Sequence, residues 1–185
     1  MRPPRRLSAL LLLFSAVGFS RETIADQPSQ SDVEAVYLFD FGKFVRWPAG
    51  ADQGPLRLCV AGGESFQAGL QRIAANENIN GRSLDVRRVL RPQDASDCAI
   101  LFIDGSERER APELLAAVAA KPTLTVSDLT DFLIRGGMIQ FQLVGNRVRF
   151  SVNLGAVTRA HLAMSSELLK VALSVKGNAL EGGPQ

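Results

Sequence analysis

The sequence contains few of the residues from which catalytic and metal sites are built. Its 185 residues include one histidine, one tryptophan, one tyrosine and two cysteines. A histidine-based triad or a zinc site would have to use His161, which lies in a predicted helical stretch with no cysteine or acidic residue near it in sequence. We therefore expect His161 to be an ordinary surface residue. Taken alone, the residue inventory supports no reaction class, catalytic site, metal site or cofactor.

Signals for phosphate and nucleic-acid binding are also weak. Gly62-Gly63 stands between a predicted strand and a predicted helix, where backbone N–H groups can hold an anion. The match to G-x-G-x-x-G is incomplete, and Glu64 adds negative charge at the same helix end, so we expect these glycines only to make the turn. The net charge is +2, but it becomes −1 without the first 25 residues, which hold four arginines and one acid. A near-neutral domain has no electrostatic reason to bind nucleic acid.

The first 25 residues have the pattern of a secretory signal peptide. Residues 2–6 are basic, and residues 7–19 form an apolar run. This run is too short to cross a bilayer, which needs about 20 apolar residues. We expect cleavage between residues 18 and 25, which leaves an exported domain. An uncleaved N-terminal anchor is the alternative.

Export changes what is expected of the two cysteines, Cys59 and Cys98. In an oxidising compartment an even number of cysteines favours a disulfide. In the chain-entropy model, closing a loop of this length stabilises the fold by about 4 kcal/mol. Two separate buried thiols are the alternative. The sequence has no C-x-x-C motif, so a thioredoxin-like site is not supported.

Composition and periodicity together predict one globular domain. Hydrophobic residues make up 46% of the chain and charged residues 22%, which excludes a disordered, collagen-like or coiled-coil protein. The pattern predicts strands at residues 56–61, 84–90, 98–103 and 123–126, and helices at residues 31–46, 64–75, 106–120, 127–133, 154–164 and 166–175. Residues 138–144 and 147–152 alternate with period two around Gly145-Asn146, which predicts a β-hairpin. The expected fold class is α/β: a mixed β-sheet flanked by helices, with a C-terminal antiparallel hairpin.

The first predicted helix has recognisable ends. It begins at a capping box, with Ser31 as N-cap and Glu34 at N3. Its apolar stripe is expected to comprise Val33, Val36, Tyr37, Phe41 and Phe44. The helix should end before Trp47-Pro48, because proline disfavours helix at the preceding residue. Because aromatic rings dominate core burial, we expect a structural corner made of Phe41, Phe44, Trp47 and Pro48.

Six segments occur in a specific order and spacing. They are residues 35–48 (AVYLFDFGKFVRWP), 58–62 (LCVAG), 97–103 (DCAILFI), 124–139 (LTVSD, then Phe132 and GGMI), 148–153 (VRFSVN) and 165–169 (SSELL). Together they resemble the YfiR family of periplasmic regulators. The resemblance covers about residues 31–175. The chain is therefore expected to have three parts: a secretory signal peptide at residues 1–25, a YfiR-like domain at residues 31–177 and a C-terminal tail at residues 178–185.

The resemblance implies a regulator without catalysis. Members of this family repress an inner-membrane diguanylate cyclase by binding its periplasmic sensor part, and an OmpA-like outer-membrane lipoprotein can titrate the repressor away. A homodimer is a further partner to consider. The family also implies that Cys59 and Cys98 form a structural disulfide. The founding member has a second disulfide in the region of residues 136–141, where this chain has no cysteine.

Three functional classes compete. The leading hypothesis is a periplasmic protein-binding regulator of cyclic-di-GMP signalling. The alternative is a periplasmic small-ligand-binding sensor that acts with a histidine kinase or another membrane partner. The third is an exported enzyme, which would need titratable groups that converge in a cleft.

The predicted hairpin and the helix after it supply a candidate partner-binding surface, made of Ile139, Phe141, Ser151 and Val157. Ile139 and Phe141 have the same parity on one strand, so both point to one face of the sheet. If that face is uncovered, it offers an apolar anchor flanked by Arg147 and Arg149, which is chemistry enriched at interfaces. The alternative is that these residues belong to the core.

Overall fold

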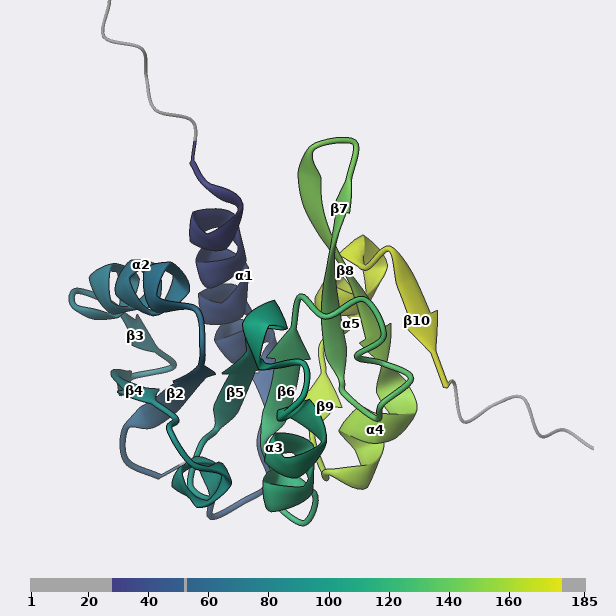
Figure 1. The fold of residues 1–185 in the computed structure, drawn as a ribbon. Helices are drawn as coiled ribbons and strands as arrows, with labels where there is room; N and C mark the ends of the chain where they lie inside the picture. The colour runs from purple at the N-terminus through teal and green to yellow at the C-terminus, as the bar shows by residue number, and fades with distance from the viewer. Residues whose placement is uncertain (1–27, 52, 178–185) are drawn as a thin grey trace, which may run out of the picture.

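A mixed eight-stranded sheet forms the centre of the molecule (Figure 1). The computed structural model describes residues 28–51 and 53–177, so the predicted signal peptide and C-terminal tail lie outside the described residues. The strand order is β10-β8-β7-β6-β5-β2-β4-β3, and two further short strands, β1 and β9, pair with each other. This single α/β domain confirms the predicted fold class.

The elements alternate along the chain. The strands are β1 (Val45–Arg46), β2 (Leu56–Ala61), β3 (Asn78–Ile79), β4 (Arg82–Arg88), β5 (Ile100–Ile103), β6 (Leu124–Ser127), β7 (Ile139–Val144), β8 (Arg147–Asn153), β9 (Ala163–Met164) and β10 (Ser174–Lys176). The helices are α1 (Gln30–Phe44), α2 (Glu64–Ala74), α3 (Ala111–Val118), α4 (Leu154–Arg159) and α5 (Ser166–Val171), with 3₁₀ turns η1 (Pro92–Ala95) and η2 (Gly105–Glu107).

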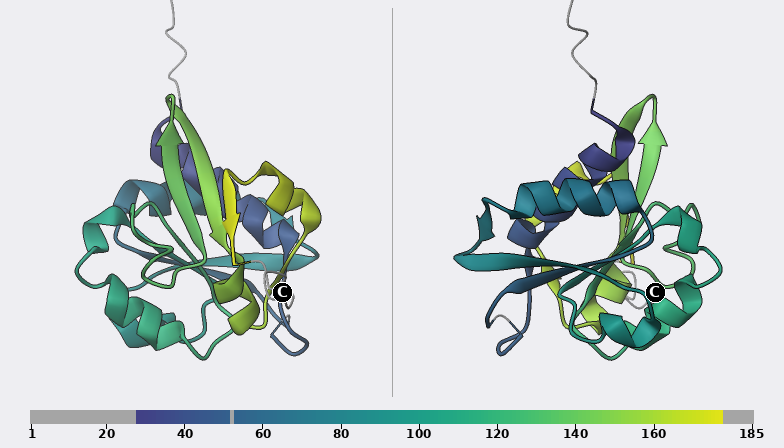
Figure 2. Two further views of the ribbon diagram at one scale, coloured as in Figure 1. Left: turned by 90° about the vertical axis from the view of Figure 1, so that its right-hand side faces the viewer. Right: turned by 60° about the vertical axis from the view of Figure 1, so that its left-hand side comes forward.

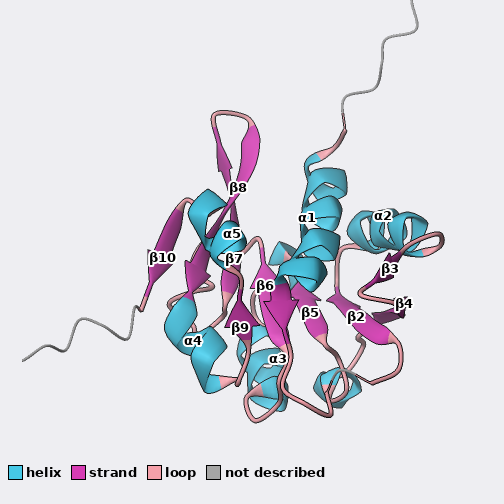
Figure 3. Cartoon of the chain, turned by 180° about the vertical axis from the view of Figure 1, so that it is seen from behind, coloured by secondary structure: helices cyan, strands magenta, loops and turns pink. Residues whose placement is uncertain are grey.

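The sheet is parallel in the middle and antiparallel towards its ends. Strands β4, β2, β5, β6 and β7 run parallel to one another, while β8 runs antiparallel to β7 and β3 antiparallel to β4. Helices α1, α2 and α5 pack on one face and α3 on the other (Figures 1 and 3). Both faces of β5 are therefore buried, as a continuous apolar strand requires.

The first helix differs from its prediction at its start and on its buried face. Its N-cap is Ser29, whose hydroxyl accepts a hydrogen bond from the backbone N–H of Asp32, so Ser31 is not the cap. The residues that α1 buries are Glu34, Ala35, Leu38, Phe39, Phe41 and Gly42. Val36 and Phe44 are exposed, which means that the buried stripe is rotated from the predicted one. Local apolar spacing missed this rotation because it scores Glu34 as a surface residue.

Two helices predicted in the middle of the chain are wrong: one is divided and the other is absent. The helix expected at residues 106–120 is divided into η2 and α3, because Pro112 favours the first turn of a new helix. The helix predicted at residues 127–133 is absent: Ser127 ends β6, and residues 130–136 form consecutive turns. The hydroxyl of Ser127 donates to the carbonyl of Ile103 and accepts from the N–H of Leu129, so it ties the turn to β5.

The C-terminal region contains the other two corrections. Helix α4 ends at Arg159, and His161 is exposed with a left-handed backbone (φ 57°), outside the helix predicted for residues 154–164. The helix predicted to reach residue 175 ends at Val171, and residues 174–176 form β10 alongside β8. The N–H of Leu173 donates to the carbonyl of Phe150 at 2.7 Å, so pairing with the edge of β8 overrides the local helical pattern.

The hairpin of β7 and β8 extends beyond the rest of the sheet, beside the first half of α1 (Figure 2). Its strands pair from Ile139↔Val152 to Val144↔Arg147, as the sequence predicted. Gly145 and Asn146 at its tip both have positive φ, the backbone that a two-residue hairpin turn of type I′ requires.

Candidate partner-binding groove

A groove of about 960 Å³ lies between α1, the β7–β8 hairpin and α5. We call it the hairpin groove. Its walls are Val33 and Tyr37 from α1, Leu143, Val148 and Phe150 from the hairpin, and Val171 from α5. Leu143 is 56% exposed and Val171 is 57% exposed, which is unusual for large apolar side chains that lie on one hollow. The groove is therefore an apolar surface that no element of the described chain covers.

The floor of the groove is a rigid cluster of aromatic rings. The ring of Phe150 lies 5.8 Å from that of Tyr37 and 5.1 Å from that of Phe41, and both pairs meet edge to face. Phe41 in turn stacks on Phe141, with ring centroids 5.8 Å apart. Such pairs add stability beyond their buried area and restrict side-chain motion. The cluster fixes the hairpin against α1 and so holds the groove open.

Positive charge surrounds the groove. Arg147, Arg149 and Lys170 lie along it, and no acidic side chain does. Elsewhere the arginines of the described residues are mostly paired with acids, as Arg57 is with Asp85. By contrast, Arg147 and Arg149 have no acidic partner among the described residues, and Arg149 reaches only the carbonyl of Val171, at 3.5 Å. An acidic, partly apolar segment of another protein would complement this surface.

None of the four predicted partner-binding residues lines this groove. Ile139, Phe141, Ser151 and Val157 are all buried in the structure. Ile139, Phe141 and Val157 belong to the main hydrophobic core, whereas Ser151 pairs with Gln140 and so points to the opposite face of the sheet from Ile139 and Phe141. Ser151 is also occupied: it accepts a hydrogen bond from Gln142 Nε2 at 2.8 Å, and its hydroxyl lies 2.9 Å from that of Ser174. A contribution of the four residues to partner binding stays a prediction.

Sequence reasoning missed Leu143, although the signal was present. Leu143 has the same parity as Ile139 and Phe141, so all three point to one face of β7. Ile139 and Phe141 are covered, whereas Leu143 lies near the tip of the hairpin, past the end of the cover. The sequence showed that Leu143 shares a strand face with Ile139 and Phe141. It did not show how far along the hairpin the neighbouring helices cover that face.

The two cysteines lie on the other side of the sheet. Cys59 and Cys98 form a disulfide with a Cα–Cα distance of 5.8 Å, and both are buried in the smaller core under α3. The disulfide joins β2 to the segment that leads into β5. It stabilises the half of the sheet that does not carry the groove.

The predicted aromatic corner is only partly buried. Phe41 is buried, Trp47 and Pro48 are half-buried, and Phe44 is 38% exposed. The indole Nε1–H of Trp47 donates to the carbonyl of Ala99 at 3.3 Å, which ties the end of α1 to the start of β5. The expectation that Phe44 is buried is wrong because the buried face of α1 is rotated away from it.

One buried acid was not foreseen. Glu34 on α1 is 3% exposed, and Gln30 Nε2 donates to its carboxylate at 2.8 Å. Burial, with the charges of Asp128 and Asp104 nearby, raises the pKa of Glu34 to about 7. Burial and the charge of Asp104 also raise the pKa of Asp128, one of whose carboxylate oxygens is buried without a hydrogen-bond partner. Because the pKa of Glu34 is about 7, the charge of this side chain changes near neutral pH.

Metal and membrane sites were also sought in the described part of the chain. Within residues 28–51 and 53–177, no group of three or more histidine, cysteine, aspartate or glutamate side chains could hold a metal ion. Over the same residues, no helix is both long enough and apolar enough to cross a membrane.

Two comparisons with known proteins bear on this site. A family model described as YfiR/HmsC-like matches residues 31–173. Among solved structures, the chain is similar to the crystal structure of a conserved domain protein from Vibrio cholerae O1 biovar El Tor, with a TM-score of 0.59 at 12% sequence identity. The match covers 80% of this chain but only 60% of that one, so this chain spans less than two thirds of its length. At such low identity the likeness shows the fold alone.

Proposed function

The chain belongs to the YfiR/HmsC-like family, and from this premise we propose that it represses a membrane diguanylate cyclase. At family level, membership supports a periplasmic regulator of cyclic-di-GMP signalling, acting with a membrane cyclase as partner, over an enzyme. In the proposed mechanism the protein binds the periplasmic sensor part of that cyclase in the hairpin groove. Binding holds the cytoplasmic catalytic domain inactive and so lowers cyclic-di-GMP.

The observation that carries this proposal is the apolar groove with its unpaired cations. Interface cores combine exposed apolar anchors with arginine, and Leu143, Tyr37 and Arg147 supply that combination. The positive rim selects an acidic partner and increases the rate at which it docks. An OmpA-like lipoprotein with similar acidic, apolar chemistry would compete for the groove and release repression. A second copy of the chain is a further occupant that the same groove would accept.

A matched pair of leucine variants tests the groove. Leu143 lies in the groove, whereas Leu90 is 65% exposed and lies elsewhere. We expect Leu143→Glu to raise cellular cyclic-di-GMP to the level of a deletion strain, because a carboxylate there disrupts both the apolar contact and the charge match. Leu90→Glu should repress normally. Both variants should melt near the temperature of the parent protein, because neither leucine is part of the core.

Charge-reversal variants give a second, independent test of the hairpin groove. Arg147→Glu combined with Arg149→Glu should weaken repression, whereas Lys121→Glu, an exposed charge away from the groove, should not. Normal repression by both the folded Leu143→Glu variant and the folded double arginine variant would show that partner binding uses another surface. Size-exclusion chromatography of the same variants separates a homodimer from a partner complex.

A further inference from the structure

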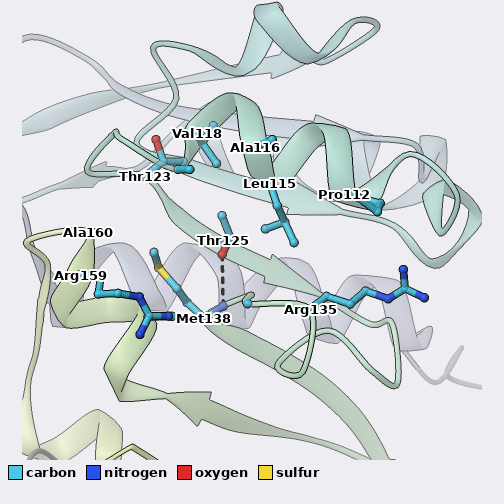
Figure 4. A pocket seen from close by; sticks show the side chains of 13 residues that line it. Pro112, Leu115, Ala116, Val118, Thr123, Thr125, Arg135, Met138, Arg159 and Ala160 are labelled. Atoms are coloured by element: carbon cyan, nitrogen blue, oxygen red, sulfur yellow. Dashed lines mark hydrogen bonds between the residues drawn. The ribbon is translucent and has the colours of Figure 1, made fainter.

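A second hollow, separate from the hairpin groove, lies between α3 and α4 (Figure 4). It has a volume of about 390 Å³ and shares no lining residue with the groove. It exists because β6 and β7 separate: they pair only at Val126↔Ile139 and Ser127↔Gln140. The first half of β6 is left without a neighbour on that side, and α3 and α4 form the walls. We call this hollow the α3–α4 pocket.

The walls of the pocket are aliphatic. Leu115, Ala116 and Val118 line it from α3, and Met138 and Ala160 line it from the opposite side. Its lining includes no acidic and no aromatic side chain. The volume is near the lower end of the range of about 300–1,000 Å³ that is usual for small-molecule sites. Such a lining suits a short aliphatic group.

One cation at the pocket is free to bind an anion. The guanidinium of Arg159 points in towards Met138 in Figure 4 and has no acidic partner among the described residues. Arg135, on the other side of the pocket, points away from Met138 and pairs with Asp131 at 2.7 Å. The two arginines therefore differ, and Arg159 is the one available to a ligand.

The floor of the pocket adds polar groups. Thr123 and Thr125 are buried there, while Leu101 and Cys59 occupy the same face of the sheet in the neighbouring strands. The hydroxyl oxygen of Thr125 accepts from the N–H of Met138 at 3.2 Å, which leaves its hydrogen to donate to a ligand. From the aliphatic walls, the unpaired guanidinium and this hydroxyl, we infer that the α3–α4 pocket binds a small aliphatic carboxylate.

The two methionines of the predicted mature chain make a direct test. Met138 lines the pocket, and Met164 in β9 lies outside it, so the methyl resonance of Met164 is an internal control. The probe is hexanoate, titrated into the mature protein carrying ¹³C-labelled methionine methyl groups. We expect a saturable shift of the Met138 methyl resonance and none at Met164. Hexanamide, which has the same chain without the charge, should bind about ten- to a hundredfold more weakly, because a hydrogen bond to a charged group is lost.

Variants separate the pocket from general effects of charge. Arg159→Gln should weaken hexanoate binding about ten- to a hundredfold, whereas Arg149→Gln on the hairpin should not change it. Ala116→Leu should block the pocket without loss of fold, because leucine is a strong helix former and position 116 is exposed. No saturable shift of Met138 up to about 10 mM hexanoate, equal binding of hexanamide, or full binding by Arg159→Gln would each overturn the inference.

Discussion

Tyr37 of α1 and Phe150 of β8 meet edge to face, with ring centroids 5.8 Å apart and an interplanar angle of 63°. Tyr37 also lines the hairpin groove, so this contact links the core to the surface that we propose for partner binding. The contact joins residues more than a hundred positions apart in sequence. The position of the hairpin beside α1 therefore depends on a small number of aromatic rings.

Removal of the Phe150 ring tests this dependence. Phe150→Ala should destabilise the protein by about 3–5 kcal/mol, because the ring is buried and contacts both Tyr37 and Phe41. Chemical denaturation of the parent and the variant measures the difference. Leu143→Ala, near the exposed tip of the same hairpin, is the matched control and should change the free energy of unfolding by less than about 1 kcal/mol. Equal losses in the two variants would contradict the anchoring role of Phe150.

Local chemistry in the sequence predicted the elements that depend on neighbouring residues. The alternation around Gly145-Asn146 gave the hairpin correctly, and α4 and α5 begin at residues 154 and 166 as predicted, with the side chains of Asn153 and Ser165 as caps. The errors in predicted secondary structure occur where contacts between residues far apart in sequence determine the structure. Residues 174–176 have a helical pattern but join the edge of β8, and that edge is a tertiary feature which no local pattern contains.

The disulfide gives a second stability prediction. Replacement of Cys59 and Cys98 together by alanine should destabilise the protein by about 2–5 kcal/mol, because the cross-link restrains a long loop in the unfolded chain. Thermal unfolding of the oxidised parent, the reduced parent and the double variant measures the cost. Two free thiols per chain in the unfolded, unreduced protein would show that the bond does not form in solution.

The Trp47 indole makes one specific contact that a conservative variant removes. Trp47→Phe keeps an aromatic ring but loses the hydrogen bond from Nε1 to the carbonyl of Ala99. We expect a loss of about 1 kcal/mol, the usual net worth of such a bond. Because Trp47 is the sole tryptophan, its fluorescence also reports its environment, and the half-buried ring should emit between the wavelengths of fully buried and fully exposed tryptophan. An emission maximum typical of full exposure would contradict the contact with Ala99.

Glu34 should make the protein less stable as the pH rises towards neutrality. Its pKa is about 7 in the folded protein and about 4.5 in an ordinary carboxyl, so the folded state holds a proton that the unfolded state loses first. Stability is therefore highest below pH 4.5 as far as this group is concerned, and falls by about 3 kcal/mol as the pH rises through 7. Among the described residues, the groups that shift the pKa of Glu34 are Gln30, Asp128 and Asp104, and none of them is a cation that could relieve the cost of ionising it. Glu34→Gln removes the ionisation and keeps an acceptor for Gln30, so its stability advantage over the parent should grow between pH 5 and pH 8. Glu77→Gln, at an exposed position, is the control, and a Glu34→Gln advantage that does not change with pH would refute the buried proton.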